Sequence, residues 1–200
     1  MDAKTGNLYT ADPVRQLLFS VSADGGRVTS VDRFPAPGLK GLACGPEGFF
    51  WSSDGEAIYK HAAGKQNSIS RKYAVPGLRP DALYWDGRTL WAADSERMSV
   101  DRFLPGDRFS SIGSIRVPGK DFTGLAADDD TLWVLDAAEM KVYRCRLPGG
   151  ENPETLALGP LLPKGARAAG LAVAGGEMWI LTDKPAELRR YSLSGLRFRK

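Results

Sequence analysis

Residues 124–136 read Gly-Leu-Ala-Ala-Asp-Asp-Asp-Thr-Leu-Trp-Val-Leu-Asp, and this stretch carries the pattern that decides the fold. The apolar run 124–127 suits a buried inner strand, and the three aspartates after it are typical turn residues. Residues 131–135 are rich in β-branched and aromatic side chains, which favour a second strand. Residues 141–146 alternate apolar and polar side chains, so they predict a half-exposed third strand. A more variable outer strand should follow.

The same order of short strands recurs along the chain. An aromatic residue is followed by an aspartate five times, at Tyr9 and Asp12, Trp51 and Asp54, Trp91 and Asp94, Trp133 and Asp136, and Trp179 and Asp183. A spacing of roughly 40 residues filled with short strands is typical of β-propeller blades. We therefore predict an all-β chain with about five four-stranded antiparallel blades in one domain, 1–200. The predicted blades span approximately 2–36, 37–76, 77–118, 119–163 and 164–200.

The first predicted blade is incomplete. Residues 2–12 match only the second half of a unit, so this blade lacks its inner strand. Strands over 15–22 and 27–34 complete it, joined by a turn at 23–26. In the last blade, Leu196–Arg199 is expected to form the outer strand. Five blades of four strands, less the missing one, give about 19 predicted strands.

Two explanations of the missing strand remain open. We favour a chain truncated at its N-terminus, with at least that strand and up to a sixth blade lost. Such a chain should expose an edge of its first blade and self-associate through it, because unpaired sheet edges invite pairing. The rival is a self-sufficient five-bladed ring in which one blade has three strands.

The repeated unit resembles the NHL repeat: Gly, apolar, Ala, apolar, then a turn, an aromatic strand ending in Asp, and a strand with Arg or Tyr. It is also similar to the six-bladed gluconolactonase and strictosidine-synthase-like proteins. The resemblance covers nearly the whole chain and implies a propeller fold, but its matching positions build the fold and do not specify an activity.

The gluconolactonase resemblance implies a divalent metal held by carboxylate and asparagine ligands on inner strands. Here Asn7, Asn67 and Asn152 all fall outside the predicted inner strands, and Asp81 alone is acidic at an inner-strand position. The family's metal site therefore does not transfer, and we predict no metal, no cofactor and no catalytic residue.

Composition excludes few classes of protein. The chain is 42% hydrophobic and 26% charged, as expected of a globular protein, and its net charge of +3 does not indicate nucleic-acid binding. No apolar run approaches the roughly 20 residues that a membrane-spanning helix needs. Cys44 and Cys145 occupy different positions in their repeats, so we expect two free thiols. The compartment stays open, since a removed signal would place the chain in the periplasm or outside the cell.

The five aspartates Asp12, Asp54, Asp94, Asp136 and Asp183 should end the second strand of each blade, all on one face of the ring. A cation site is one interpretation. We favour a structural role, in which each carboxylate accepts hydrogen bonds from backbone N–H groups of its own turn.

The crossings from one blade to the next carry one cation each, at Lys40, Arg79, Lys120 and Arg167. A basic ring on this face, with Asp81 beside it, could attract an anion or an acidic partner. Ion pairing with Glu56, Glu96, Glu139 and Glu187 on the same face is the simpler interpretation. These basic residues remain the best candidate ligand site.

The histidine and the tryptophans of the chain are weak candidates for catalysis, metal binding or ligand binding. His61 is the sole histidine and lies at the end of a third strand, so a Ser-His-Asp triad or a histidine-rich zinc site is not expected. Trp51, Trp91, Trp133 and Trp179 should pack between blades, and Trp85 should also pack, near the turn after an inner strand.

We therefore predict a non-enzymatic binding or scaffold module that recognises a protein partner or a small anionic ligand on the face of the crossing loops. The alternative is a lactonase-like hydrolase or lyase whose channel site is incomplete in this chain.

Overall fold

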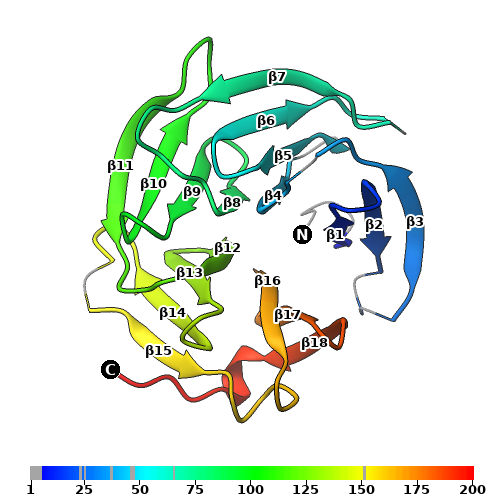
Figure 1. Cartoon of the computed structure of the whole chain (residues 1–200). Helices are drawn as coiled ribbons and strands as arrows, with labels where there is room; N and C mark the ends of the chain where they lie inside the picture. Colours follow the sequence, from blue (N-terminus) through cyan, green and yellow to red (C-terminus); the bar gives the residue numbers. More distant parts are fainter. Residues whose placement is uncertain are drawn as a thin grey trace.

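The computed structural model describes residues 6–22, 24, 26–36, 38–45, 48–64, 66–150 and 152–200. They form five antiparallel sheets arranged in a ring (Figure 1). The chain is thus an all-β, five-bladed β-propeller, as the repeat predicted, and its first blade has three strands.

The strands of each blade run in order from the centre of the ring outward (Figure 1). Blade one contains β1 (Leu8–Asp12), β2 (Leu17–Val21) and β3 (Val28–Arg33). Blade two contains β4 (Gly41–Cys44), β5 (Phe50–Ser53), β6 (Ala57–His61) and β7 (Ile69–Ala74). Blade three contains β8 (Ala82–Trp85), β9 (Leu90–Asp94), β10 (Ser99–Leu104) and β11 (Ser110–Arg116). Blade four contains β12 (Phe122–Asp128), β13 (Thr131–Asp136), β14 (Lys141–Arg146) and β15 (Glu154–Ala157), and blade five contains β16 (Arg167–Ala174), β17 (Glu177–Asp183) and β18 (Glu187–Ser192).

Each blade turns an aromatic side chain of its second strand toward the next blade. The four second-strand tryptophans are at most 5% exposed, and an aromatic of this size buries about 150–250 Å². Each aromatic shares an apolar cluster with the following blade: Tyr9 with Phe50, Trp51 with Leu83, Trp91 with Leu125, Trp133 with Val173, and Trp179 with Leu8. The last of these contacts closes the ring from blade five to blade one.

Inner strands approach each other so closely that a glycine is required at two of the contacts. A Cβ on Gly41 would lie 3.0 Å from the backbone nitrogen of Leu83. A Cβ on Gly124 would lie 2.7 Å from the backbone nitrogen of Leu171 and 2.6 Å from its Cβ. A glycine of one inner strand therefore receives the leucine of the next, which explains the Gly-Leu-Ala pattern in the sequence.

Gly170 of β16 differs from these two glycines. The nearest described atoms to a Cβ at this position belong to Leu181 of its own blade, at 3.5 and 3.7 Å, which is ordinary contact. No described strand of blade one lies inside β1, so Gly170 does not receive a leucine from the following blade.

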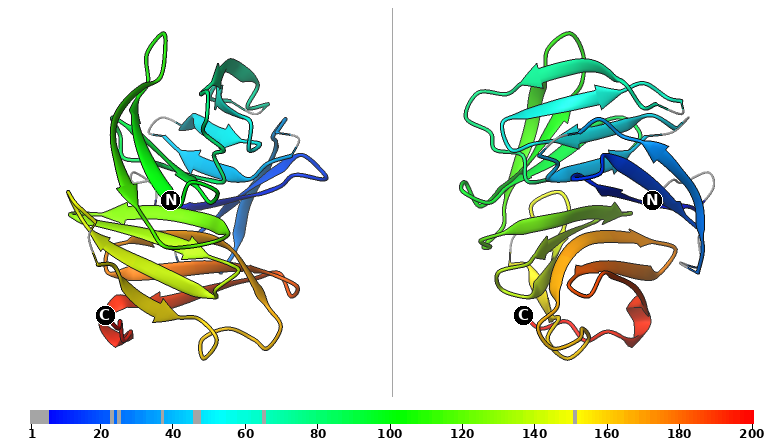
Figure 2. Two further views of the ribbon diagram at one scale, coloured as in Figure 1. Left: turned by 60° about the vertical axis from the view of Figure 1, so that its left-hand side comes forward. Right: turned by 45° about the vertical axis from the view of Figure 1, so that its right-hand side comes forward.

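The predicted outer strand of blade five is wrong. Leu196–Arg199 leaves blade five and reaches β15 of blade four, where Arg199 and Thr155 exchange backbone hydrogen bonds of 2.7 and 2.9 Å. Both views of Figure 2 place the end of the chain beside blade four. The apolar side of this segment explains the choice, because the ring of Phe198 packs 5.4 Å from that of Trp133 and lies under the guanidinium of Arg144.

The described residues contain 18 strands and not the predicted 19, because the C-terminal segment does not join blade five. Residues 2–5, with which the first predicted unit begins, lie outside the described residues, as do Ala23, Gly25 and Pro37 of two predicted turns. Truncation of the chain stays a prediction.

Within the described part of the chain, no helix is long and apolar enough to span a membrane.

Two alanine substitutions test the contacts between inner strands. Gly124→Ala should lower the free energy of unfolding by about 1 to 3 kcal/mol, because the added Cβ overlaps Leu171. Gly170→Ala should leave it unchanged or raise it by up to about 1 kcal/mol, because the site has room and alanine restricts the unfolded chain. Urea denaturation measures both, and equal losses would contradict the difference between the two sites.

Candidate functional site

The crossings between blades and the turns after the second strands meet on one face of the ring. In blade three the backbone N–H of Arg79, on the crossing, donates to Asp94 Oδ2 at 2.8 Å. In blade four the N–H of Lys120 donates to Asp136 Oδ2 at 2.6 Å. These bonds fasten both crossings to the turns of their own blades, so the backbone that carries Arg79 and Lys120 is held in place.

The turn aspartates bind backbone N–H groups. The second oxygens of Asp94 and Asp136 accept from the N–H groups of Arg97 and Glu139, at 3.0 and 2.9 Å. In the first two blades, Asp12 accepts from Val14 and Arg15, and Asp54 accepts from Glu56 and Ala57, each at 2.9 Å. These four carboxylates thus accept hydrogen bonds from backbone N–H groups of their own blades.

Blade five departs from this arrangement. The strand register pairs Thr182 with Glu187, as it pairs Asp136 with Lys141 in blade four, so Thr182 occupies the turn position. Its hydroxyl donates to the carbonyl of Pro185 at 2.7 Å. Asp183 lies one residue later and is exposed. The aromatic-to-aspartate spacing is one residue longer here, which is the sequence signal for this difference.

All four predicted cations form ion pairs on this face, and we call these pairs the mouth ring. Two pairs join neighbouring blades: Lys40 Nζ lies 2.7 Å from Asp81 Oδ1, and the Arg167 guanidinium lies 2.9 Å from Asp121 Oδ2. Two lie within a blade: Arg79 pairs with Glu96, and Lys120 Nζ lies 3.4 Å from Glu139 Oε1. Each basic residue that the sequence singled out therefore lies beside a carboxylate in the mouth ring.

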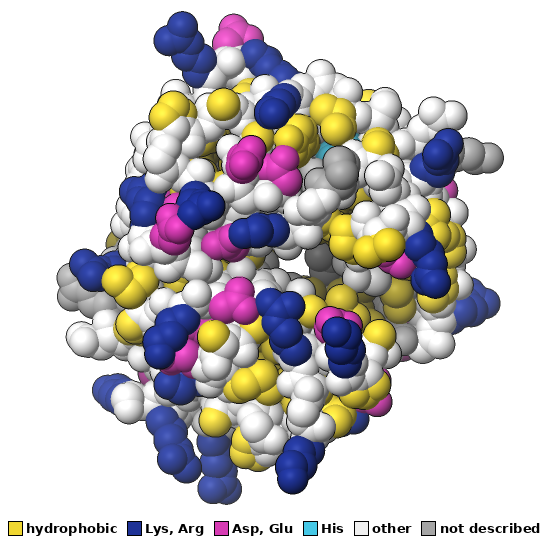
Figure 3. Space-filling view, in the orientation of Figure 1, with side chains coloured by type: hydrophobic (Ala, Val, Ile, Leu, Met, Phe, Trp, Pro, Cys, Tyr) yellow, Lys and Arg dark blue, Asp and Glu magenta, His cyan; other side chains and the backbone are white. Residues whose placement is uncertain are grey.

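The basic side chains of the mouth ring stay open to solvent. They are 50% exposed at Lys40, 60% at Arg79, 74% at Lys120 and 56% at Arg167. Figure 3 shows acidic and basic side chains side by side around the centre of this face. Donor groups that are not used by the carboxylates are thus available to a ligand.

Glu139 of the ring also accepts hydrogen bonds from two side chains of β14. The hydroxyl of Tyr143 donates to it at 2.8 Å and the ammonium group of Lys141 at 3.0 Å, and together they lower the pKa of Glu139 to about 2. Burial and the neighbouring Glu139 carboxylate raise the pKa of Tyr143 well above its usual value. Glu139 therefore stays ionised and Tyr143 stays neutral at physiological pH.

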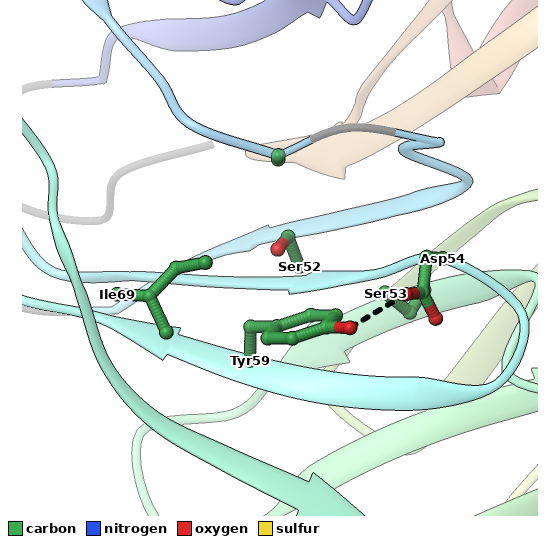
Figure 4. Close-up of a pocket in the computed structure, with 6 residues that line it drawn as sticks. Ser52, Ser53, Asp54, Tyr59 and Ile69 are labelled. Carbon is green, nitrogen blue, oxygen red and sulfur yellow. Dashed lines mark hydrogen bonds between the residues drawn. The ribbon is translucent and has the colours of Figure 1, made fainter.

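A cavity of about 220 Å³ lies in blade two, lined by Ala36, Ser52, Ser53, Asp54, Tyr59 and Ile69 (Figure 4). The Tyr59 hydroxyl donates to Asp54 at 2.6 Å, which raises the pKa of Tyr59 to about 12. Burial favours the neutral form of Asp54, but hydrogen bonds from Tyr59 and two backbone N–H groups outweigh it and lower the pKa of Asp54. The ionised carboxylate of Asp54 and the hydroxyl groups of Ser52, Ser53 and Tyr59 therefore belong to residues that line the cavity.

Ser52 and His61 form a buried pair that the sequence did not reveal. Ser52 is 1% exposed and His61 is fully buried, with Ser52 Oγ 2.8 Å from His61 Nε2. His61 Nδ1 lies 2.7 Å from the Asn67 carbonyl oxygen, which can only accept, so Nδ1 carries the proton and Nε2 accepts from Ser52. The only sequence signal was a serine at the strand position where other blades carry Ala92, Val134 and Ile180.

This pair fastens blade two to blade one. The imidazole stacks on Phe34 with ring centroids 4.3 Å apart, and the Asn67 side chain donates to the Arg33 carbonyl at 3.0 Å. Burial lowers the pKa of His61 and outweighs the opposing hydrogen bond to Asn67. The neutral imidazole therefore belongs to the interface between the blades.

The remaining aromatic and thiol candidates lie within the fold. Trp85 is half-buried and packs against Trp51, with ring centroids 5.6 Å apart. Within the described residues neither Cys44 nor Cys145 forms a disulfide, and burial raises the pKa of Cys145 to about 11. Within the described ranges, no three His, Cys, Asp or Glu side chains converge as a metal site would require.

Asp136→Ala tests the turn aspartates. It should lower the free energy of unfolding by about 2 to 4 kcal/mol, because two backbone N–H groups lose their acceptor. Asp183→Ala, at an exposed position, should change it by less than about 0.5 kcal/mol. Chemical denaturation compares the two variants, and a small effect of Asp136→Ala would rule out the structural role.

His61 should make stability fall as the pH drops from 7.5 to 5.5. The pKa of His61 is below 6.5 in the folded chain, so the unfolded chain binds the proton more readily as the pH falls. Below about pH 6.5 this protonation stabilises the unfolded chain relative to the folded one. The free energy of unfolding should fall by at most about 1.4 kcal/mol per pH unit. Urea denaturation at several pH values measures it. His61→Gln should remove the slope in this window, and an unchanged slope would refute the assignment.

No protein-family model matches the chain, and no curated protein matches it. Solved structures do match. Glutaminyl cyclase of Myxococcus xanthus is 14% identical with a TM-score of 0.70, over 96% of this chain and 86% of that one. A nidogen/laminin complex contains a chain 15% identical with a TM-score of 0.67, over 100% and 76%.

Virginiamycin B lyase of Staphylococcus aureus is 18% identical with a TM-score of 0.55, over 96% of this chain and 68% of that one. These sequence identities are too low to assign the activity of any of these proteins to this chain. They show that the chain shares the β-propeller fold of proteins that include two enzymes and a component of a protein complex.

Proposed function

We propose that this propeller is a recognition module that binds a protein partner through the mouth ring. The observation that carries the proposal is that four basic side chains, each at least half exposed, are held beside acidic ones on a rigid face. Because two of the four crossing backbones, at Arg79 and Lys120, are fastened to buried aspartates, these two loops need little ordering on binding.

The ion pairs favour a protein over a small anion. Each cation already has a carboxylate partner, so a small anion must compete with that carboxylate for the same donors. A protein surface that carries both signs of charge can pair with the acids and the bases together, which gives specificity and speeds association. One of the structural neighbours is part of a nidogen/laminin complex, which is in keeping with a protein-binding propeller.

The alternative, a hydrolase or lyase, has less support. Its channel chemistry would centre on Asp81, which the sequence pattern placed at an inner-strand position and which directly precedes β8 in the structure. Both oxygens of Asp81 are engaged, one by Lys40 at 2.7 Å and the other by the backbone N–H of Ser95 at 3.1 Å. The comparison with glutaminyl cyclase and virginiamycin B lyase extends only to the fold.

Charge reversal tests the proposal with a fluorescent poly-glutamate peptide as the acidic probe. The double variant Lys40→Glu with Arg79→Glu should bind it about tenfold or more weakly by fluorescence anisotropy in low salt, because two attractive contacts become repulsive. The matched control is Arg88→Glu with Arg146→Glu, which changes the net charge equally on the opposite face, in the turn between β8 and β9 and at the last residue of β14.

The control variant should bind like the native chain. Equal weakening in both variants would mean that only net charge matters, and this would refute recognition by the mouth ring. Complete competition by millimolar inorganic phosphate would identify a small-anion site in place of a protein-binding one. Thermal melting of both variants checks that the fold is intact.

A further inference from the structure

Ser52 and His61 have the geometry of a nucleophile and its general base. Ser52 Oγ donates to His61 Nε2 at 2.8 Å, and His61 Nδ1 donates to the Asn67 carbonyl at 2.7 Å. The carbonyl thus fixes the tautomer in which Nε2 can accept a proton from the serine. A backbone carbonyl here takes the position that a carboxylate occupies in a Ser-His-Asp triad.

The imidazole is held in one orientation and is available as a base. Its ring stacks on Phe34 with centroids 4.3 Å apart, and the Asn67 side chain donates to the Arg33 carbonyl at 3.0 Å. His61 is fully buried, and burial lowers its pKa, so the ring is neutral at physiological pH. A neutral, fixed imidazole beside a hydroxyl group is the arrangement that general-base catalysis needs.

The cavity of blade two brings a reactant to this serine. Ser52 is part of the cavity wall, although the residue is only 1% exposed. Ser52 pairs with Tyr59 and Phe50 pairs with His61, so these four side chains point to one face of the blade. Figure 4 shows Ser52, Tyr59 and Ile69 along the cavity, on three neighbouring strands. Ile69 is 43% exposed, which places one side of the cavity at the surface.

The lining of the cavity favours small molecules without negative charge. Its volume of about 220 Å³ is below the roughly 300–1,000 Å³ of usual ligand pockets. Hydrogen bonds lower the pKa of Asp54 and keep this carboxylate ionised, and none of the described lining residues is basic. An anionic reactant therefore meets a like charge in the cavity, whereas an uncharged acyl compound does not.

We infer that Ser52 is an acyl-accepting nucleophile, with His61 as its general base, for small uncharged esters that enter the cavity of blade two. Ser52 Oγ bonds to the carbonyl carbon while its proton passes to His61 Nε2. The ester C–O bond then breaks and the leaving oxygen takes that proton, which gives an acyl-serine and an alcohol. Water then attacks the acyl carbon with the same base, releasing the acid and restoring the serine hydroxyl. This activity does not rest on the proposed protein binding.

The probe is p-nitrophenyl acetate, because its acetyl group is small and uncharged. The full chain should release a burst of p-nitrophenolate and carry an acetyl ester on Ser52, located by peptide mass spectrometry. Neutral hydroxylamine should remove this ester, whereas acetyl amides formed on lysines resist it. Mono-p-nitrophenyl succinate should acylate Ser52 about tenfold more slowly, because its carboxylate approaches Asp54.

Three variants assign the roles. Ser52→Ala should abolish the burst, and His61→Gln should slow it by about a hundredfold or more, because the general base is lost. The matched control is Ser53→Ala. Ser53 is equally buried on the same strand, but its hydroxyl accepts from the Gly41 N–H at 3.0 Å. This variant should react like the native chain, and thermal melting checks the fold of each variant.

Four results would overturn the inference. The native chain would carry no acetyl ester on Ser52, or the ester would lie on Tyr59, or the two esters would react equally, or His61→Gln would react at the native rate. The first three are measured on the native chain, so they hold even where a variant does not fold. An ester on Ser52 that forms normally in Ser53→Ala and slowly in His61→Gln supports the inference.

Discussion

Close contact between successive inner strands is the constraint on which this propeller depends. Where Gly41 faces Leu83 and Gly124 faces Leu171, a single added carbon would overlap the backbone of the next blade. These two glycines let the sheets of blades two and three, and of blades four and five, approach each other closely, and the second-strand aromatics fill the wider space between neighbouring blades. Small residues at the centre and large ones farther out give each sheet its wedge-shaped place in the ring.

The same constraint positions the surface. Because the inner strands are fixed, the crossings that lead into them are fixed as well, and Asp94 and Asp136 bind the backbones of those crossings. The ion pairs of the mouth ring stand on this support. Two of them join different blades, so the arrangement of charges on this face depends on how the blades are placed in the ring and not on the conformation of one loop.

Much of this could be predicted from local sequence, because strand periodicity and turn residues are local properties. The five sheets, the three-stranded first blade and the crossing cations follow from the repeat. The path of Leu196–Arg199 could not be predicted, since its preference for β15 comes from Trp133 and Arg144, which are distant in sequence. The Ser52–His61 pair was missed because its two residues meet across neighbouring strands and their contact depends on the exact strand register. The role of Thr182 was missed because one extra residue shifts the turn.

The central claim is that close glycine–leucine contacts between successive inner strands hold neighbouring blades in place. Amide hydrogen exchange of the native chain and of Gly124→Ala tests it most directly, because the added carbon overlaps Leu171 of the next blade. The account predicts faster exchange in both β12 and β16, on the two sides of this contact. Faster exchange confined to β12, or no change in either strand, would contradict it.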